Sequence, residues 1–206
     1  MPIKKKLSNK SVKLIKYYKL INYNLIYNNQ AINRYKKNFN EISGNKVANL
    51  NILEKLITNI QNCKLKKNAK NIVFADGNPE AKIMLIGEGP GANEDLEGLP
   101  FVGRAGTLLD KMLKSINLSR ENVYITNVVN YRPPENRKPT DEEINRYLPF
   151  LKRHIEIIKP KILVLLGSTA LNALIGKEQV ISKMRGKWIE KKVGDLKISL
   201  IVTFHP

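Results

Sequence analysis

Four short apolar runs alternate along this chain with segments of helical periodicity. The runs cover residues 83–87, 123–129, 162–166 and 197–204. Apolar strands that are separated by crossover helices form a mostly parallel sheet, and helices cover both of its faces. We therefore predict an α/β fold: a three-layer α/β/α sandwich with a mainly parallel, four-stranded central sheet.

Two of the intervening segments predict long amphipathic helices. The first spans about residues 105–117, and the apolar side chains expected to be buried are Leu108, Leu109, Met112, Leu113 and Ile116. The second spans about residues 141–159 and begins at a capping box formed by Thr140 and Glu143. Pro149 lies inside this second helix and predicts a kink.

The composition divides the chain near residue 46. Residues 1–46 are rich in Lys, Asn and Tyr, and residues 1–50 hold eleven Lys or Arg but a single acid, Glu41. We predict a basic, partly disordered N-terminal extension over residues 1–46 and a folded domain over residues 47–206. The formal net charge of +18 indicates a polyanionic partner, nucleic acid before an acidic membrane. A solvated basic surface without a partner is the alternative.

Two compartments are disfavoured by the sequence. No apolar run is long enough to span a membrane, and no apolar segment of a secretory signal follows the basic N-terminus. The single cysteine, Cys63, cannot form an intramolecular disulfide and is consistent with a reducing compartment. We expect a cytoplasmic protein without membrane contact.

Each predicted strand ends in residues with chemical functions. Ligands of parallel sheets bind beyond the carboxyl ends of the strands, where this chain places a Gly-Glu-Gly-Pro-Gly loop over residues 87–91, Asn127, Gly167-Ser168-Thr169 and His205. Together with the ring of Phe101, these groups suit a flat, polar, aromatic ligand. A carboxamide can donate and accept at the edge of a nucleobase, and an aromatic ring can stack on its face. Taken singly, each residue is more typical of a turn or a core; the set indicates a site.

Six motifs follow one another in order along the chain. They are GEGPGANED (87–95), GLPFVGRAG (98–106), YITNVVNYRPPENRKPT (124–140), LVLLGSTALNALIG (163–176), ISKMRGKW (181–188) and TFHP (203–206). In this set, which spans roughly residues 50–206, the chain resembles the type-4 uracil-DNA glycosylases. The resemblance implies a DNA repair enzyme that flips uracil out of DNA and hydrolyses its N-glycosidic bond. It also implies a monomer, with uracil-containing DNA as substrate and replication or repair proteins as candidate partners.

The resemblance assigns roles to individual residues. The implied catalytic residues are Glu88, His205 and, as a second candidate for the acidic role, Glu94. The implied uracil-binding residues are Glu88, Gly89, Pro90, Phe101, Asn127 and His205. The implied DNA contacts are Arg104, Arg132, Arg137 and Arg185, although each of these arginines can equally be solvated.

The chain departs from this family in two places. Four cysteines hold a 4Fe–4S cluster in the family, and the corresponding positions here are Ile60, Cys63, Tyr131 and Tyr147. A single thiolate cannot hold such a cluster, so we expect no cofactor and no metal site, with packing of the other three side chains instead. In the family the His-Pro motif continues into a DNA-wedging loop and a final helix. The chain stops at Pro206, so we expect a domain that is shortened at its C-terminus.

Two other functions stay open at this point. The first is a degenerate, catalytically weak relative of the same fold that binds DNA without cutting it, such as a polymerase-associated module. The replaced cysteines and the short C-terminus favour this alternative, whereas the retention of Glu88, Phe101, Asn127 and His205 favours the active glycosylase. The second is a nucleotide-binding α/β protein that acts on something other than DNA.

Overall fold

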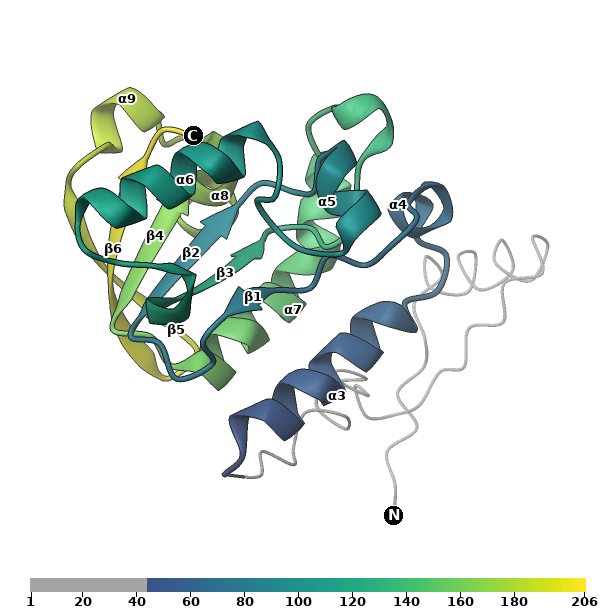
Figure 1. Ribbon diagram of the computed structural model, residues 1–206, viewed down its shortest axis with the longest axis horizontal. Coiled ribbons are helices and arrows are strands. Elements are labelled where there is room, and N and C mark those ends of the chain that lie inside the picture. Colours follow the sequence, from purple (N-terminus) through teal and green to yellow (C-terminus); the bar gives the residue numbers. More distant parts are fainter. Residues whose placement is uncertain (1–43) are drawn as a thin grey trace, which may run out of the picture. The chain divides into compact units, whose positions relative to one another are not determined.

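The computed structural model describes residues 44–206, so almost all of the predicted extension over residues 1–46 lies outside the described residues. Residues 44–206 contain one six-stranded sheet with the strand order β1-β3-β2-β4-β6-β5 (Figure 1). Its strands are β1 (Asp76–Gly77), β2 (Ile83–Gly87), β3 (Val123–Asn127), β4 (Ile162–Leu166), β5 (Trp188–Val193) and β6 (Leu196–Thr203). The α/β class is as predicted.

The four predicted strands form the parallel centre of this sheet. Strands β3, β2, β4 and β6 pair in parallel, whereas β1 and β5 pair antiparallel to their neighbours at the two edges. The prediction of four strands was therefore wrong by two edge strands. β1 has only two residues, and β5 (Trp-Ile-Glu-Lys-Lys-Val) alternates exposed and partly buried positions, so neither reads as an apolar run.

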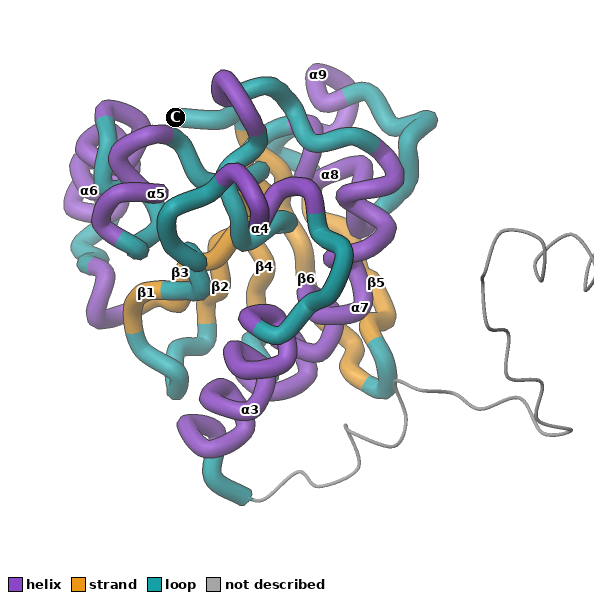
Figure 2. Tube along the Cα trace, turned by 90° about the vertical axis from the view of Figure 1, so that its right-hand side faces the viewer, coloured by secondary structure: helices purple, strands orange, loops and turns teal. Residues whose placement is uncertain are grey.

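Helices cover both faces of the sheet (Figures 1 and 2). α6 lies over one face, and α7 and α8 lie over the other, which makes the three layers. The helices of the described residues are α3 (Lys46–Thr58), α4 (Lys64–Asn68), α5 (Ala92–Glu97), α6 (Arg104–Ser115), α7 (Asp141–Ile158), α8 (Ser168–Leu174) and α9 (Ile181–Met184), with short 3-10 turns η1 (Arg120–Asn122) and η2 (Pro134–Asn136). Within residues 44–206, no helix combines the length and the apolar composition that crossing a membrane requires.

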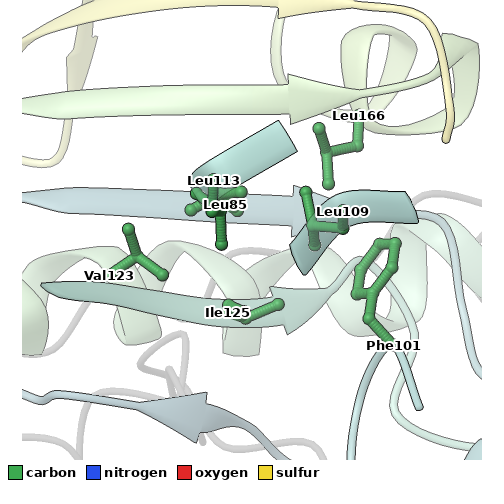
Figure 3. Close-up of a cluster of buried hydrophobic side chains, with 7 residues drawn as sticks. All are labelled: Leu85, Phe101, Leu109, Leu113, Val123, Ile125 and Leu166. Atoms are coloured by element: carbon green, nitrogen blue, oxygen red, sulfur yellow. The ribbon is translucent and has the colours of Figure 1, made fainter. Parts of the chain in front are cut away.

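Alternation along the strands divides the core between the two layers. The side chains that pack under α6 are Leu85, Val123, Ile125 and Leu166 of the sheet with Leu109, Leu113 and Phe101 (Figure 3). Intervening positions such as Met84 and Tyr124 face the α7 side, where the Tyr124 hydroxyl lies 2.7 Å from Nε2 of His154. Both faces of β2 and β3 are buried, as expected for parallel strands at the centre of a sheet.

α6 is less deeply buried than its periodicity predicts. Leu109 and Leu113 are buried, but the exposed fractions of Leu108, Met112 and Ile116 are 46 %, 40 % and 64 %. Leu109 and Leu113 lie one turn apart on the side that faces the sheet, whereas Leu108 and Met112 lie towards the flank of the helix. The prediction that all five apolar side chains are buried was therefore wrong, because the sheet reaches only part of the apolar stripe.

α7 begins at the predicted capping box. The Thr140 hydroxyl accepts a hydrogen bond from the Glu143 N–H (3.3 Å), and the Thr140 N–H donates to the Glu143 carboxylate (2.8 Å). The helix runs for 18 residues and contains Pro149. On its buried face, His154 stacks on Phe74 at a centroid distance of 4.6 Å, and burial lowers the pKa of this histidine to about 3. His154 is therefore a neutral core residue at physiological pH.

Candidate active site

The sheet has its topological switch point between β2 and β4. From β2 the chain crosses to β3 on one side, and from β3 it returns past β2 to β4 on the other side. Ligands of such sheets bind in the crevice beyond the carboxyl ends of the strands at this point. A cavity of about 400 Å³ opens there. The six residues predicted to bind uracil all line it: Glu88, Gly89, Pro90, Phe101, Asn127 and His205.

Gly87 allows two of these side chains to converge. It is the last residue of β2 and pairs in register with Asn127, the last residue of β3. A Cβ atom at Gly87 would lie 2.4 Å from the Asn127 Oδ1 atom and 2.6 Å from the Phe101 ring. The carboxamide and the ring therefore meet over a glycine, and any side chain at this position would displace them. Asn127 itself is 3 % exposed, which leaves its carboxamide facing the cavity rather than bulk solvent.

The backbone at Phe101 adopts a left-handed conformation that is unusual for a bulky residue, with φ at 56°. Arg120 holds this turn: its guanidinium donates to the carbonyl oxygens of Pro100 (3.0 Å) and Phe101. Asp76 (2.7 Å) and Asp110 (2.8 Å) hold the guanidinium in turn. Sequence analysis missed Arg120, because its partners are distant in the sequence and no local pattern connects them.

His205 lies against the ring of Phe101. The two rings stack at a centroid distance of 5.7 Å and an interplanar angle of 25°. His205 Nδ1 lies 3.0 Å from the carbonyl oxygen of Pro206. On the β4 side, the Cβ position of Gly167 is 3.3 Å from the Cβ of His205, so a glycine here permits the close approach.

Glu94 organises two loops around the cavity. One oxygen of its carboxylate accepts hydrogen bonds from the N–H groups of Val102 (2.9 Å) and Gly103 (2.8 Å). The other oxygen accepts from the N–H of Gly91 (3.1 Å). The loop after β2 is thereby joined to the loop that carries Phe101. Both oxygens are thus engaged by backbone amides, although Glu94 also lines the cavity.

The carboxylate of Glu88, unlike that of Glu94, bonds to a side chain rather than to backbone N–H groups. Its Oε2 atom accepts a hydrogen bond from the hydroxyl of Thr169, in the first turn of α8. Its backbone carbonyl accepts from the N–H of Val129 (3.2 Å), beyond the end of β3. Glu88 therefore lies between elements from both sides of the switch point. Sequence analysis placed Thr169 at the end of a predicted strand but assigned it no role.

Of the four arginines proposed to contact DNA, only Arg137 lines the cavity. Lys138, which sequence analysis missed, lines it as well. Arg137 forms a bidentate ion pair with Glu143 (2.7 and 2.8 Å), which lowers the pKa of that carboxylate. The other three lie elsewhere: Arg104 begins α6, Arg132 donates to Asn136 (2.7 Å), and Arg185 lies 4.8 Å from the ring of Phe204.

Comparison with known proteins agrees with this geometry. The family model described as "Uracil DNA glycosylase superfamily" matches residues 74–206. The chain belongs to the uracil DNA glycosylase superfamily. It is 45 % identical over 163 residues to the type-4 uracil-DNA glycosylase of Saccharolobus solfataricus, which covers 77 % of this chain and 76 % of the relative. It is 48 % identical over 145 residues to the type-4 uracil-DNA glycosylase of Thermotoga maritima, which covers 70 % and 74 % of the two chains.

The chain is also similar to a small part of a much longer protein. The chain is 36 % identical over 115 residues to a DNA polymerase of Bacillus phage SP01. The match covers 55 % of this chain but only 12 % of the polymerase. A sequence similar to this chain therefore forms a small part of that polymerase.

The iron–sulfur cluster that the resemblance to type-4 glycosylases implies does not fit the residues of this superfamily member. Of the four implied positions, only Cys63 carries a thiol. Its Sγ atom lies 3.3 Å from the hydroxyl of Tyr147, which is 1 % exposed. Burial is the main cause that raises the pKa of both Tyr147 and Tyr131, so both phenols are neutral.

The segment around Cys63 is also joined directly to α7. The guanidinium of Arg146 donates to the carbonyl oxygens of Asn62 (3.0 Å) and Gln61. Within residues 44–206, no cluster of three or more His, Cys, Asp or Glu side chains is arranged to hold a metal ion. The donor set here is a thiol with phenols, which does not match the four thiolates of a 4Fe–4S cluster.

Proposed function

We propose that this chain is a uracil-DNA glycosylase that hydrolyses the N-glycosidic bond of uracil in DNA and leaves an abasic site. The observation that supports the proposal most directly is the convergence of Glu88, Phe101, Asn127 and His205 on one cavity at the switch point. These groups provide a carboxylate, a stacking ring, a donor–acceptor edge and an imidazole. Membership of the uracil DNA glycosylase superfamily supports the same conclusion.

Recognition of the base is assigned to three residues. The flipped uracil stacks on the ring of Phe101, and the carboxamide of Asn127 donates and accepts at the edge that distinguishes uracil from cytosine. Because Asn127 is 3 % exposed, its hydrogen bonds form away from competing water and discriminate strongly. The backbone of Gly89-Pro90 provides the neighbouring wall of the cavity.

Catalysis is assigned mainly to electrostatic stabilisation. The bond between C1′ of the sugar and N1 of the base breaks with its electron pair on the base, and His205 donates a hydrogen bond to the uracil oxygen that gains negative charge. The Glu88 carboxylate offsets the positive charge on the sugar and orients a water molecule. The water oxygen bonds to C1′ and its proton passes to Glu88.

The remaining predicted residues receive supporting roles. Because backbone N–H groups engage both oxygens of Glu94, we assign this residue to positioning the two loops rather than to the chemical step. Arg137, together with Lys138 beside the cavity, contacts DNA phosphates. Arg104, Arg132 and Arg185 are proposed as further phosphate contacts.

The wider setting is also proposed. Residues 47–206 form the glycosylase domain, which acts as a monomer without a metal or cluster, and the basic residues 1–46 add affinity for DNA. The single cysteine is consistent with action in a reducing cytoplasm. Replication and repair proteins are candidate partners.

One observation favours a second candidate function. A similar sequence forms 12 % of a phage DNA polymerase. In this alternative, the chain is a catalytically weak DNA-binding module of the same fold, and it works beside a polymerase.

Cleavage of a uracil-containing single-stranded oligonucleotide under single-turnover conditions, followed by alkali, tests the two candidates. We expect cleavage by the wild-type chain and a loss of about 100-fold or more in the Asn127→Ala variant, because a buried polar contact to the base is removed. Asn51→Ala, on an exposed position of α3, is the matched control and should cleave normally. Salt-sensitive DNA binding without cleavage by the wild-type chain would instead favour the binding module.

A further inference from the structure

We propose that Thr169 is a positioning residue that holds the Glu88 carboxylate in its catalytic orientation. The inference rests on the proposed glycosylase function. It adds to that function a residue that does not line the cavity. Glu88 lines the cavity, whereas Thr169 does not. Thr169 therefore acts on the reaction only through Glu88.

The contact between the two residues is specific. The hydroxyl of Thr169 donates to Oε2 of Glu88, from a position 81 residues further along the chain. A threonine hydroxyl has a single proton to donate, and a hydrogen bond to a carboxylate is stronger than one between neutral groups. Thr169 is 7 % exposed, so little water competes for that proton.

The fold brings Thr169 to this place through the switch point. β2 and β4 are neighbouring parallel strands, and their carboxyl ends lead to Glu88 and to α8, respectively. Gly167, with φ at 92°, turns the chain from β4 directly into α8, which places Thr169 in the first helical turn. Thr169 lies in the wall of a second, smaller cavity of about 190 Å³, which Lys138 and Ser168 connect to the wall of the first.

Glu88 is consequently held at two points. Its carbonyl oxygen accepts from Val129 on the β3 side, and its Oε2 accepts from Thr169 on the α8 side. Among residues 44–206, no side chain or backbone group bonds its second carboxylate oxygen, Oε1. This arrangement leaves one oxygen for the water and the sugar while the other fixes the plane of the carboxylate. Small errors in the position of a catalytic group reduce rates strongly.

The test is a double-mutant cycle on the single-turnover cleavage rate. We expect Thr169→Val, which keeps the shape of the side chain and removes the donor, to lower this rate by about 10- to 100-fold with little change in DNA affinity. Thr169→Ser keeps the hydroxyl and should restore most of the rate. In a Glu88→Gln background, Thr169→Val should have little further effect, because its route to the reaction has been removed.

Thr126→Val is the matched control. Thr126 is also buried, and its hydroxyl donates to the carbonyl oxygen of Phe74 (2.7 Å) rather than to Glu88. This variant loses a comparable buried hydrogen bond, and its rate should stay near that of the wild type. If Thr169→Val unfolds, Thr169→Ala and Thr169→Ser supply the same comparison, with folding checked by thermal denaturation.

The outcomes separate this inference from the function on which it rests. A wild-type chain that cleaves while Thr169→Val cleaves equally fast would overturn the inference alone. An equal loss in the wild-type and Glu88→Gln backgrounds would also overturn it, because Thr169 would then act independently of Glu88. A wild-type chain that does not cleave would overturn both proposals.

Discussion

The resemblance to type-4 glycosylases implies a base-binding site in one region of this domain and an iron–sulfur cluster in another. The two regions differ in the side chains that they hold. The first is the cavity region, Glu88, Phe101, Asn127 and His205, whose polar and aromatic groups converge on one space. The second is the thiol–tyrosine region, Cys63, Tyr131 and Tyr147, whose side chains are all buried against one another or nearby core.

The contrast shows which kind of residue role can be taken over by other side chains. A base-binding cavity needs particular donors and acceptors at particular positions, so its residues cannot be exchanged for packing. A group that only links segments of the chain can be exchanged for any arrangement that links them. Here the hydroxyl of Tyr147 and the guanidinium of Arg146 join residues 61–63 to α7. The comparison predicts that one region controls cleavage and the other controls stability.

The largest effects are expected when stability and cleavage rate are both measured for one variant of each region. Tyr147→Ala should lower the free energy of unfolding by about 3–5 kcal/mol, because it opens a large cavity in the core, while the cleavage rate of the folded fraction stays near wild type. Urea denaturation and single-turnover cleavage at low temperature measure the two quantities. Tyr147→Phe, which keeps the ring, is the control and should lose far less stability.

The second variant of this comparison lies in the cavity region. Asn127→Ala should remove cleavage with a much smaller loss of stability than Tyr147→Ala. A Tyr147→Ala protein that is fully folded but inactive would contradict this division of roles, because the thiol–tyrosine region would then contribute to the chemistry.

The next effect is the pH dependence of stability, which we attribute to His154, a second buried residue of α7. The pKa of His154 is about 3 in the folded state, below the ordinary value of about 6.5 that the unfolded chain retains. Below pH 6.5 the unfolded chain therefore binds a proton that the folded chain does not. Stability should fall as the pH falls from about 6.5 towards 3, by about 3 kcal/mol between pH 7 and pH 4, and should be insensitive to this group at higher pH.

Urea denaturation between pH 4 and pH 8 measures this slope. In His154→Gln the slope between pH 6.5 and pH 4 should be much reduced, even though the variant also loses the hydrogen bond to Tyr124. An unchanged slope would show that other groups cause the acid sensitivity. Because His154 lies outside the cavity, the same substitution should leave the pH dependence of cleavage unchanged.

The smallest effect is expected on the flank of α6. Leu108→Gln should change the free energy of unfolding by no more than about 0.5 kcal/mol, because the side chain is already 46 % exposed. Leu109→Ala, one position along, should cost about 2–5 kcal/mol, because Leu109 is 2 % exposed. Thermal denaturation of the pair measures the contrast, and similar losses in both variants would contradict the burial pattern of this helix.

Several features of this protein could be predicted from the sequence because their causes are local. Of the four parallel strands, β2 and β3 are buried on both faces and read as continuous apolar runs, whereas β6 alternates buried and partly exposed positions and still reads as a strand. The start of α7 follows from two residues three positions apart, Thr140 and Glu143. The gathering of Glu88, Asn127 and His205 in one crevice follows from topology, because parallel strands bring their carboxyl ends to the same edge.

Other features were decided only by the tertiary structure. The edge strands β1 and β5, the hold of Arg120 on the Phe101 turn, and the contact between Thr169 and Glu88 all join residues that are far apart in the sequence or only weakly patterned. The same holds for the exposed flank of α6, since periodicity shows which residues share a side of a helix but not how much of that side the sheet covers. Such contacts depend on which elements become neighbours. No local spacing records that choice.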